Sequence, residues 1–424
     1  MKLKKELGLL ELSLYGVGII LGAGIYSLIG VGAGVAGNTL WLSFIFAAIM
    51  ATFTGLSYAE LSSMFPKEAA EYNYVKNAFK INILSFIVGW LMFISSIVAA
   101  VTVVFGFSGY FSHMFGGNIN VIALFVILIL SLINYRGIKE SSKFNIVSTL
   151  IETLGLLIVI GLGIWFFLKY GINVNLFETP SGFFDIKSVL LATSLIFFAY
   201  LGFEDIVNVS EETKNAKKIV PKALVIAIIV STILYSLVAF SSINILGWEK
   251  LSLSKAPLTQ VVSSVIPNSD FIFSLIALFA TANTALILLI VGSRVLYGMS
   301  VGKSLPKLFS KVGKRGTPYF SVFVVTILSL ILSLFTNIKL VASITDMSLF
   351  LVYFFVNSSL IVLRYKQPKL KRQFRAPINI GNFPVLAFLG VISSIFLLFY
   401  FDTNIYFIEL LIILSSFILY YIFK

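Results

Sequence analysis

Long apolar runs dominate the chain and restrict what it can fold into. A helix needs about 20 consecutive apolar residues to cross the hydrocarbon core of a bilayer. Hydrophobic residues make up 59% of the chain and charged residues only 12%, a composition that excludes a soluble globular domain. We therefore predict an all-α integral membrane protein with 12 transmembrane helices, in which residues 1–424 form a single polytopic domain. The twelve predicted segments lie near 11–36, 40–65, 83–112, 120–135, 144–168, 188–210, 222–246, 270–298, 319–337, 340–363, 382–400 and 404–423.

The basic residues indicate how these segments are oriented. A soluble protein with a formal charge of +13 would be a candidate for binding nucleic acid. Here, most of the 31 basic residues lie at the N-terminus and in every second connection between the apolar runs. By the positive-inside rule we predict a multi-pass protein of the cell membrane, with both termini cytoplasmic, the lipid bilayer as its surroundings and no nucleic-acid partner. The intervening connections hold only Lys169, Lys187, Lys250, Lys255 and Lys339.

Residues that commonly carry enzyme chemistry are scarce. The chain has no cysteine and a single histidine, so neither a thiolate site nor a histidine cluster for a metal is expected. No serine–histidine pair and no glycine-rich phosphate loop are evident in the sequence. We expect a protein that is not an enzyme and that uses no cofactor and no metal.

Glycines interrupt the first apolar segment. Gly22 and Gly24 flank Ala23 in the middle of the run. Because a helix in lipid must satisfy its own backbone groups, glycines at this depth mark a place where the helix can open toward something polar. The alternative is that Gly18 and Gly22, four residues apart, allow another helix to pack closely. The segment alone leaves both interpretations open.

The sixth segment carries a similar interruption. Gly202 is followed at once by the acids Glu204 and Asp205, which would be costly in a continuous lipid-facing helix. Either the helix breaks here, or the acids line water, or the span ends at Gly202. Segments 1 and 6 are five apart and so run in opposite directions, which is typical of transporters built from inverted repeats. We predict a first repeat at 11–168, a second at 188–363 and two peripheral helices at 382–423.

A third intramembrane acid lies in the fifth segment. Glu152 is about 12 Å of helical rise beyond Phe144 and so falls well inside a core roughly 30 Å thick. An ionisable residue at such a depth is by default a candidate for function. The alternative is a neutral glutamic acid that ties two helices together by hydrogen bonds.

The motifs around these positions resemble those of the amino acid-polyamine-organocation (APC) superfamily, particularly its cationic amino acid transporter-like prokaryotic branch. The segment 1 break is similar to the family's Gly-Ser-Gly-Ile-Phe, and segment 6 and the stretch after it are similar to the family's motifs at the same places. The resemblance covers most of residues 10–365. It rests on Gly22–Tyr26, Phe197–Ile206, Glu211–Pro221, Ala282–Ala285, Ser293–Met299, Leu305–Pro306 and Thr317–Pro318.

The chain departs from the family pattern in several places. Ala69 and Ala70 stand where the family usually has two glycines, and Ala216 stands where it has proline. Ser300–Lys303 replaces the family's Ala-Arg-Asp-Gly. Glu152 stands where related proton-coupled members carry a lysine, so the lysine mechanism does not transfer unchanged.

The resemblance implies a LeuT-type 5+5 inverted repeat with two additional C-terminal helices and a substrate that is an amino acid or a related amine. Amides at the start of the outer half of segment 1 would bind the carboxylate, and carbonyls at both breaks would bind the ammonium. Phe198 would close over the substrate as an aromatic wall, while Ser96 and Asn283 would shape the pocket for its side chain. The predicted substrate-binding residues are Ile20, Leu21, Gly22, Ala23, Gly24, Ser96, Phe198, Ala199, Leu201, Gly202, Phe203 and Asn283.

We therefore predict a secondary active amino acid permease that works by alternating access. Glu152 and Glu204 are the predicted ion-coupling residues, with H⁺ favoured because burial disfavours the charged form of a carboxyl group, and with Na⁺ as the alternative. Proton symport is the first hypothesis, and exchange of amino acids or polyamines is the second. An ion channel that uses the same broken helices ranks below both.

Overall fold

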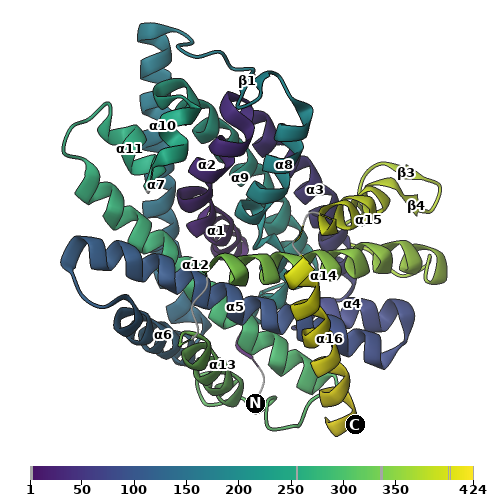
Figure 1. Cartoon of the computed structure of the whole chain (residues 1–424). Helices are drawn as coiled ribbons and strands as arrows, with labels where there is room; N and C mark the ends of the chain where they lie inside the picture. Colours follow the sequence, from purple (N-terminus) through teal and green to yellow (C-terminus); the bar gives the residue numbers. More distant parts are fainter. Residues whose placement is uncertain (1–2, 255, 335–337, 400, 402, 424) are drawn as a thin grey trace.

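The computed structural model describes the backbone of residues 3–254, 256–334, 338–399, 401 and 403–423. It is almost entirely helical, with two short antiparallel hairpins, and both chain ends lie toward the lower side of Figure 1. The first half contains α1 (Leu9–Leu21), α2 (Ala23–Ala36), η1 (Gly37–Thr39), α3 (Leu40–Met64), α4 (Ala70–Phe79), α5 (Asn82–Phe115), α6 (Ile119–Arg136), α7 (Ile138–Tyr170), β1 (Glu178–Thr179) and β2 (Gly182–Phe183). The second half contains α8 (Ile186–Ile196), η2 (Phe197–Tyr200), η3 (Phe203–Glu212), α9 (Ala216–Leu246), α10 (Trp248–Leu253), α11 (Pro257–Ser263), α12 (Asp270–Val301), α13 (Tyr319–Leu332), α14 (Ile338–Lys366), β3 (Asn379–Ile380), β4 (Phe383–Pro384), α15 (Val385–Leu398) and α16 (Thr403–Phe423).

The described part of the chain contains 10 helical segments long and apolar enough to cross a membrane. Two shorter apolar helices, Tyr319–Leu332 and Val385–Leu398, lie within the predicted segments 319–337 and 382–400. An all-α membrane architecture is thus present, while a count of twelve crossings remains a prediction.

Both predicted interruptions are present in the backbone. Helix α1 ends at Leu21, Gly22 has φ −53° and ψ −141°, and α2 begins at Ala23. In the sixth segment the 3₁₀ helix η2 is followed by an extended Leu201 and by Gly202 at φ +113°, a left-handed conformation that favours glycine. The chain then continues as the 3₁₀ helix η3, so the segment breaks at Gly202 and does not end there.

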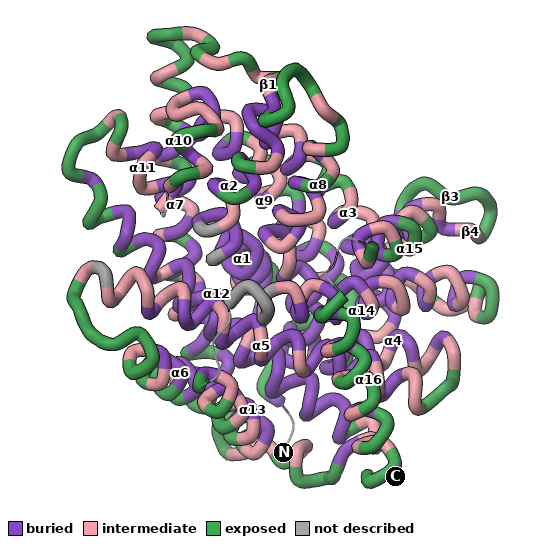
Figure 2. The backbone as a smooth tube through the Cα atoms, viewed as in Figure 1, coloured by how far each residue is buried: buried purple, intermediate pink, exposed green. Residues whose placement is uncertain are grey.

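Helix α1 lies at the centre of the molecule, where it packs against α7, α9, α12 and η3. Figure 2 shows the buried residues concentrated in this region and the exposed ones on the outer helices. Large apolar side chains such as Leu128, Leu154 and Phe407 are exposed on that outer surface. This pattern is expected where lipid and not water surrounds the protein.

One outer helix carries a buried acid. Glu409 of α16 is buried, and the hydroxyl of Ser348 on α14 lies 3.0 and 2.9 Å from its two carboxylate oxygens. No acid of the last two segments is among the predicted functional residues, and the structure shows that Glu409 is buried. The hydrogen bond from Ser348 joins α16 to α14.

A buried ion network fastens the end of α3 to the end of α14. Arg364 donates from Nε and Nη2 to the two carboxylate oxygens of Glu60, both at 2.6 Å. Arg372 donates to the same carboxylate at 3.0 Å, and the Ala376 amide donates to it at 2.8 Å. Glu60 is fully buried, so its charge depends on these donors for the interactions that water would otherwise supply.

This network yields a stability prediction. Glu60→Gln leaves two arginines near an uncharged partner, and breaking a buried pair in this way costs about 3–5 kcal/mol. We expect a clearly lower midpoint of thermal unfolding for the purified variant in detergent. The exposed Lys250 of α10 provides the control, and Lys250→Ala should leave the midpoint near that of the parent. Equal midpoints for Glu60→Gln and the parent would contradict the proposed importance of the network.

Candidate functional site

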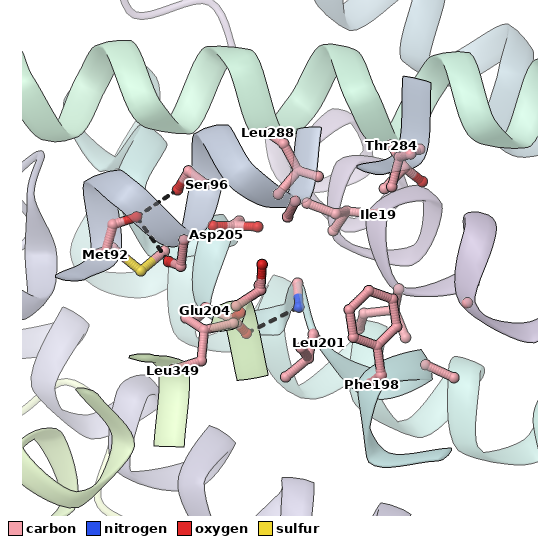
Figure 3. Close-up of a pocket in the computed structure, with 18 residues that line it drawn as sticks. Ile19, Met92, Ser96, Phe198, Leu201, Glu204, Asp205, Thr284, Leu288 and Leu349 are labelled. Atoms are coloured by element: carbon pink, nitrogen blue, oxygen red, sulfur yellow. Dashed lines mark hydrogen bonds between the residues drawn. The ribbon is translucent and has the colours of Figure 1, made fainter. Parts of the chain in front are cut away.

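A small cavity lies where the two breaks meet α5, α12 and α14 (Figure 3). Its volume of about 50 Å³ has room for a few water molecules. Most of its wall is apolar, with hydroxyl groups and two carboxyl groups interspersed. The lining residues are Ile19, Ile20, Gly24, Met92, Ser95, Ser96, Ala99, Val103, Phe198, Ala199, Leu201, Gly202, Glu204, Asp205, Thr284, Leu288, Thr345 and Leu349.

The structure brings many of the predicted site residues together around this cavity. Those among the lining residues are Ile20, Gly24, Ser96, Phe198, Ala199, Leu201, Gly202 and Glu204. The two broken segments also touch directly, because a Cβ atom placed on Gly24 would lie 2.7 Å from the Cα of Ala199. The predicted residues outside the lining set are Leu21, Gly22, Ala23, Glu152, Phe203 and Asn283.

A tyrosine that the sequence analysis does not predict binds the carbonyls at both breaks. The hydroxyl of Tyr235 on α9 contacts the carbonyl oxygen of Ile20 and lies 3.1 Å from that of Ala199. One hydroxyl proton serves one acceptor at a time, and each carbonyl oxygen has two lone pairs, so capacity remains for a further donor. In the sequence, Tyr235 looks like any aromatic residue of an apolar segment.

The two adjacent acids of segment 6 both line the cavity, as Figure 3 shows. Glu204 accepts a hydrogen bond from the Gly202 amide at 3.0 Å and so supports the break. Asp205 is buried, and its Oδ1 has no hydrogen-bond partner within the described chain. Asp205 is not among the predicted site residues. Its position next to Glu204 in the sequence is the feature that could have indicated it.

Glu152 belongs to a polar cluster beside α1. Asn145, Thr149 and Glu152 lie on one face of α7, at the spacing that brings helical side chains together. The side-chain amide of Asn283 on α12 donates to Glu152 Oε1 at 3.1 Å and to Thr149 Oγ1 at 3.3 Å, while Asn145 donates to the Asn283 oxygen at 3.0 Å. Glu152 Oε2 has no partner among the described residues. Asn283 thus contacts Glu152, whereas the prediction placed it in the substrate pocket.

The glycines of α1 allow this cluster to approach the helix. A Cβ on Gly18 would lie 2.0 Å from Thr149 Oγ1 and 2.7 Å from Asn283 Nδ2. At Gly22 a Cβ would lie 1.6 Å from Thr284 Oγ1, a buried hydroxyl that lines the cavity. Close packing and helix interruption therefore occur in the same segment, and the two interpretations of these glycines are compatible.

Buried polar contacts join separate segments on the predicted cytoplasmic side. Arg294 of α12 donates to both carboxylate oxygens of Glu212 at 3.0 Å. The amides of Glu6 and Leu7 donate to the Glu212 carbonyl at 3.0 and 3.1 Å, which fastens the N-terminal segment to the end of η3. Across the described residues, no group of three His, Cys, Asp or Glu side chains is arranged to hold a metal ion.

Ala69 immediately precedes α4, on the predicted cytoplasmic side, and is one of the departures from the family pattern. Its φ of +48° is left-handed, a conformation that glycine adopts at no steric cost and alanine adopts at about 1–2 kcal/mol. The family's glycine is therefore understandable here. This chain adopts the left-handed turn with alanine.

Comparisons with known proteins agree with these features. The family model described as amino acid permease matches residues 7–422. The branched-chain amino acid permease BcaP of Bacillus subtilis is 29% identical over 93% of this chain and 88% of its own length. The methylthioribose transporter of B. subtilis is 31% identical over 88% of this chain and 84% of its own length.

A plant relative extends the range of similar proteins. The vacuolar cationic amino acid transporter 4 of Arabidopsis thaliana is 27% identical over 87% of this chain and 64% of its own length. The names of these relatives refer to different substrates, so they do not agree on one compound. The family match, by contrast, spans nearly the whole chain. The chain belongs to the amino acid permease family of the APC superfamily.

Proposed function

We propose that this chain is a secondary active permease of the cell membrane that moves an amino acid or a related amine by alternating access. Under this proposal it has a LeuT-type 5+5 inverted repeat, with repeats at 11–168 and 188–363, two added helices at 382–423 and both termini in the cytoplasm. The observation that carries the proposal is the direct contact between two interrupted helices, five segments apart, at a buried cavity.

The interrupted backbone suits the two charged ends of an amino acid. The first amides of α2 have no partner inside their own helix and face outward from its positive end, where a carboxylate binds well. Carbonyls of Ile20 and Ala199 lie at the cavity wall, where an ammonium group can add to the Tyr235 contact. The remaining apolar and hydroxyl-bearing wall is available for the substrate side chain.

Proton coupling is supported by the carboxylates around α1. Glu152 is fully buried, and one of its oxygens has a single amide donor while the other has none in the described structure. Such a group is stable when it carries a proton or binds a cation, and costly otherwise. We favour symport over exchange because Glu152 is not among the cavity-lining residues. A proton or cation can therefore bind at Glu152 while the substrate occupies the cavity.

The test of the proposed function is a thermal-shift screen of amino acids and polyamines on the purified protein, followed by counterflow in proteoliposomes. We expect a stabilising compound to show saturable counterflow. Gly24→Val should abolish it while the protein remains folded in the membrane, since any Cβ on Gly24 meets the Ala199 backbone. Gly109→Ala is the control, because a Cβ there has nothing within 4 Å. Stabilisation without counterflow would favour a binding or sensing role, and ion currents without saturable flux would favour a channel.

Glu152→Gln tests the coupling site. Gln keeps an acceptor for Asn283 but takes up no proton, so we expect uptake driven by a pH gradient to fall at least tenfold while counterflow persists. Glu409→Gln, which alters another buried acid on α16 outside the cavity lining, should retain both activities. Concentrative, pH-driven uptake by Glu152→Gln would remove this residue from coupling.

Glu204→Gln separates the second acid from the first. Its carboxylate supports the Gly202 amide, and Gln offers that amide a neutral acceptor. We expect the variant to keep substrate binding in the thermal-shift assay and to lose the steep pH dependence of uptake. An unchanged pH profile would leave Glu204 with a role only in supporting the break.

A further inference from the structure

An asparagine of segment 6 connects the broken helix to the loop on the predicted cytoplasmic side. The side-chain amide of Asn208 on η3 lies 3.1 and 3.0 Å from the two carboxylate oxygens of Glu71 on α4. The Asn208 side-chain oxygen accepts from the Ala70 amide at 3.0 Å. All three residues are buried. Asn208 therefore holds the start of α4 against η3 through both ends of its amide group.

The Glu71 carboxylate faces acids and phenols. Glu204 and Asp205 of η3, Tyr58 of α3 and Tyr74 of α4 are the titratable groups that act on it electrostatically. Within the described part of the chain, no Lys or Arg forms an ion pair with Glu71. Glu204 also lines the central cavity, so the acids extend from the cavity to this contact.

The contact depends on the charge of Glu71. As a carboxylate, Glu71 presents two acceptor oxygens to the Asn208 amide, and hydrogen bonds to an ionised acceptor are roughly twice as strong as neutral ones. When one oxygen carries a proton it becomes a donor that faces another donor, so the paired contact weakens.

Glu71 lies outside the membrane-spanning segments, and its environment keeps both forms accessible. Burial raises the pKa of Glu71 to about 7, while donation from Asn208 opposes the rise and the nearby Glu204 adds to it. The sign follows directly. Above about pH 7 the carboxylate and its contact predominate, and below about pH 7 the neutral form and the weaker contact predominate.

We propose that Glu71 is the cytoplasmic proton site of the transport cycle: its carboxylate holds the inner gate closed through Asn208, and its protonation releases the gate. The proposal rests on the proposed proton-coupled transport. A proton that enters from the cavity side then favours inward opening, and its loss to the cytoplasm restores the closed contact. No covalent step is involved, since one proton is gained and the same proton is lost.

A cysteine reporter measures gate opening without substrate. The chain has no cysteine, so Ser95→Cys creates a single thiol at the cavity wall. The Ser95 hydroxyl donates only to Met92 in its own helix, at 2.9 Å, and the replacement is similar in size. The full-length protein is reconstituted in proteoliposomes and labelled from the cytoplasmic face with a membrane-impermeant maleimide between about pH 6 and pH 8.

The comparison is with Glu71→Gln in the same reporter, which cancels the pH dependence of the thiol itself. A group with a pKa near 7 changes from roughly one-tenth to nine-tenths protonated over this range. We therefore expect the parent labelling rate, relative to Glu71→Gln, to rise up to about ninefold from pH 8 to pH 6. Glu71→Gln mimics the protonated form, so it should label at least as fast as the parent at every pH.

Two further variants keep the test decisive. Asn208→Ala removes the donor and should keep a constant labelling rate relative to Glu71→Gln, so it replaces Glu71→Gln as the reference if that protein fails to fold. Glu68→Gln changes a buried acid on the same loop that accepts from the Glu211 amide and does not bond to Asn208, so it should keep the pH response. A parent labelling rate that stays constant relative to Glu71→Gln between pH 6 and pH 8 overturns the proposal, as does an equal loss of this relative response in Glu68→Gln.

The outcome is independent of the transport test. If the labelling rate depends on pH through Glu71 but the protein shows no counterflow, the gate proposal stands and the permease proposal is refuted. If the protein shows counterflow but its labelling rate does not depend on Glu71, the permease proposal stands and the gate proposal is refuted.

Discussion

Inside a bilayer, every backbone amide and carbonyl must find a partner in the protein, in trapped water or in a ligand. This constraint explains the arrangement at the two breaks. Tyr235 bonds to the carbonyls that the breaks release, and Glu204 accepts from the Gly202 amide. The first amides of α2 have no hydrogen-bond acceptor within their own helix. Backbone groups available to a ligand thus follow from the same requirement that makes an interrupted membrane helix stable, and under the proposed function that ligand is a zwitterion.

The buried carboxylates divide into two groups around α1. Asp205 faces the cavity with one oxygen unpaired in the described structure, and Glu152 lies behind α1 in the cluster with Asn283. An uncompensated charge at either place is costly, so each position favours a proton or a cation. Because Gly18 lets the Asn283 cluster contact α1 directly, a change in the state of Glu152 acts on the same helix that forms the site.

The sequence predicts the breaks well because glycines and acids are chemically conspicuous inside apolar runs. Gly22 and Gly202 interrupt their segments as expected. Contacts between distant segments are a different matter: Asn283 and Glu152 are 131 residues apart, and no local pattern shows that one bonds to the other. Tyr235 was missed because an aromatic residue in an apolar helix has no distinguishing signal until its hydroxyl is placed in space.

The inner closure combines contacts that respond differently to protons. Arginine keeps its charge at any physiological pH, and the N-terminal backbone bonds to the Glu212 carbonyl do not titrate at all. The backbone bonds hold the segment before α1 at the end of η3, and Arg294 joins α12 to the same end. Glu71 is the acid that Asn208 holds, so protonation there weakens the contact between η3 and α4 while the backbone bonds to Glu212 stay in place. Under the proposed mechanism, η3 stays joined to the N-terminal segment and to α12 through Glu212 while its contact with α4 through Glu71 and Asn208 weakens.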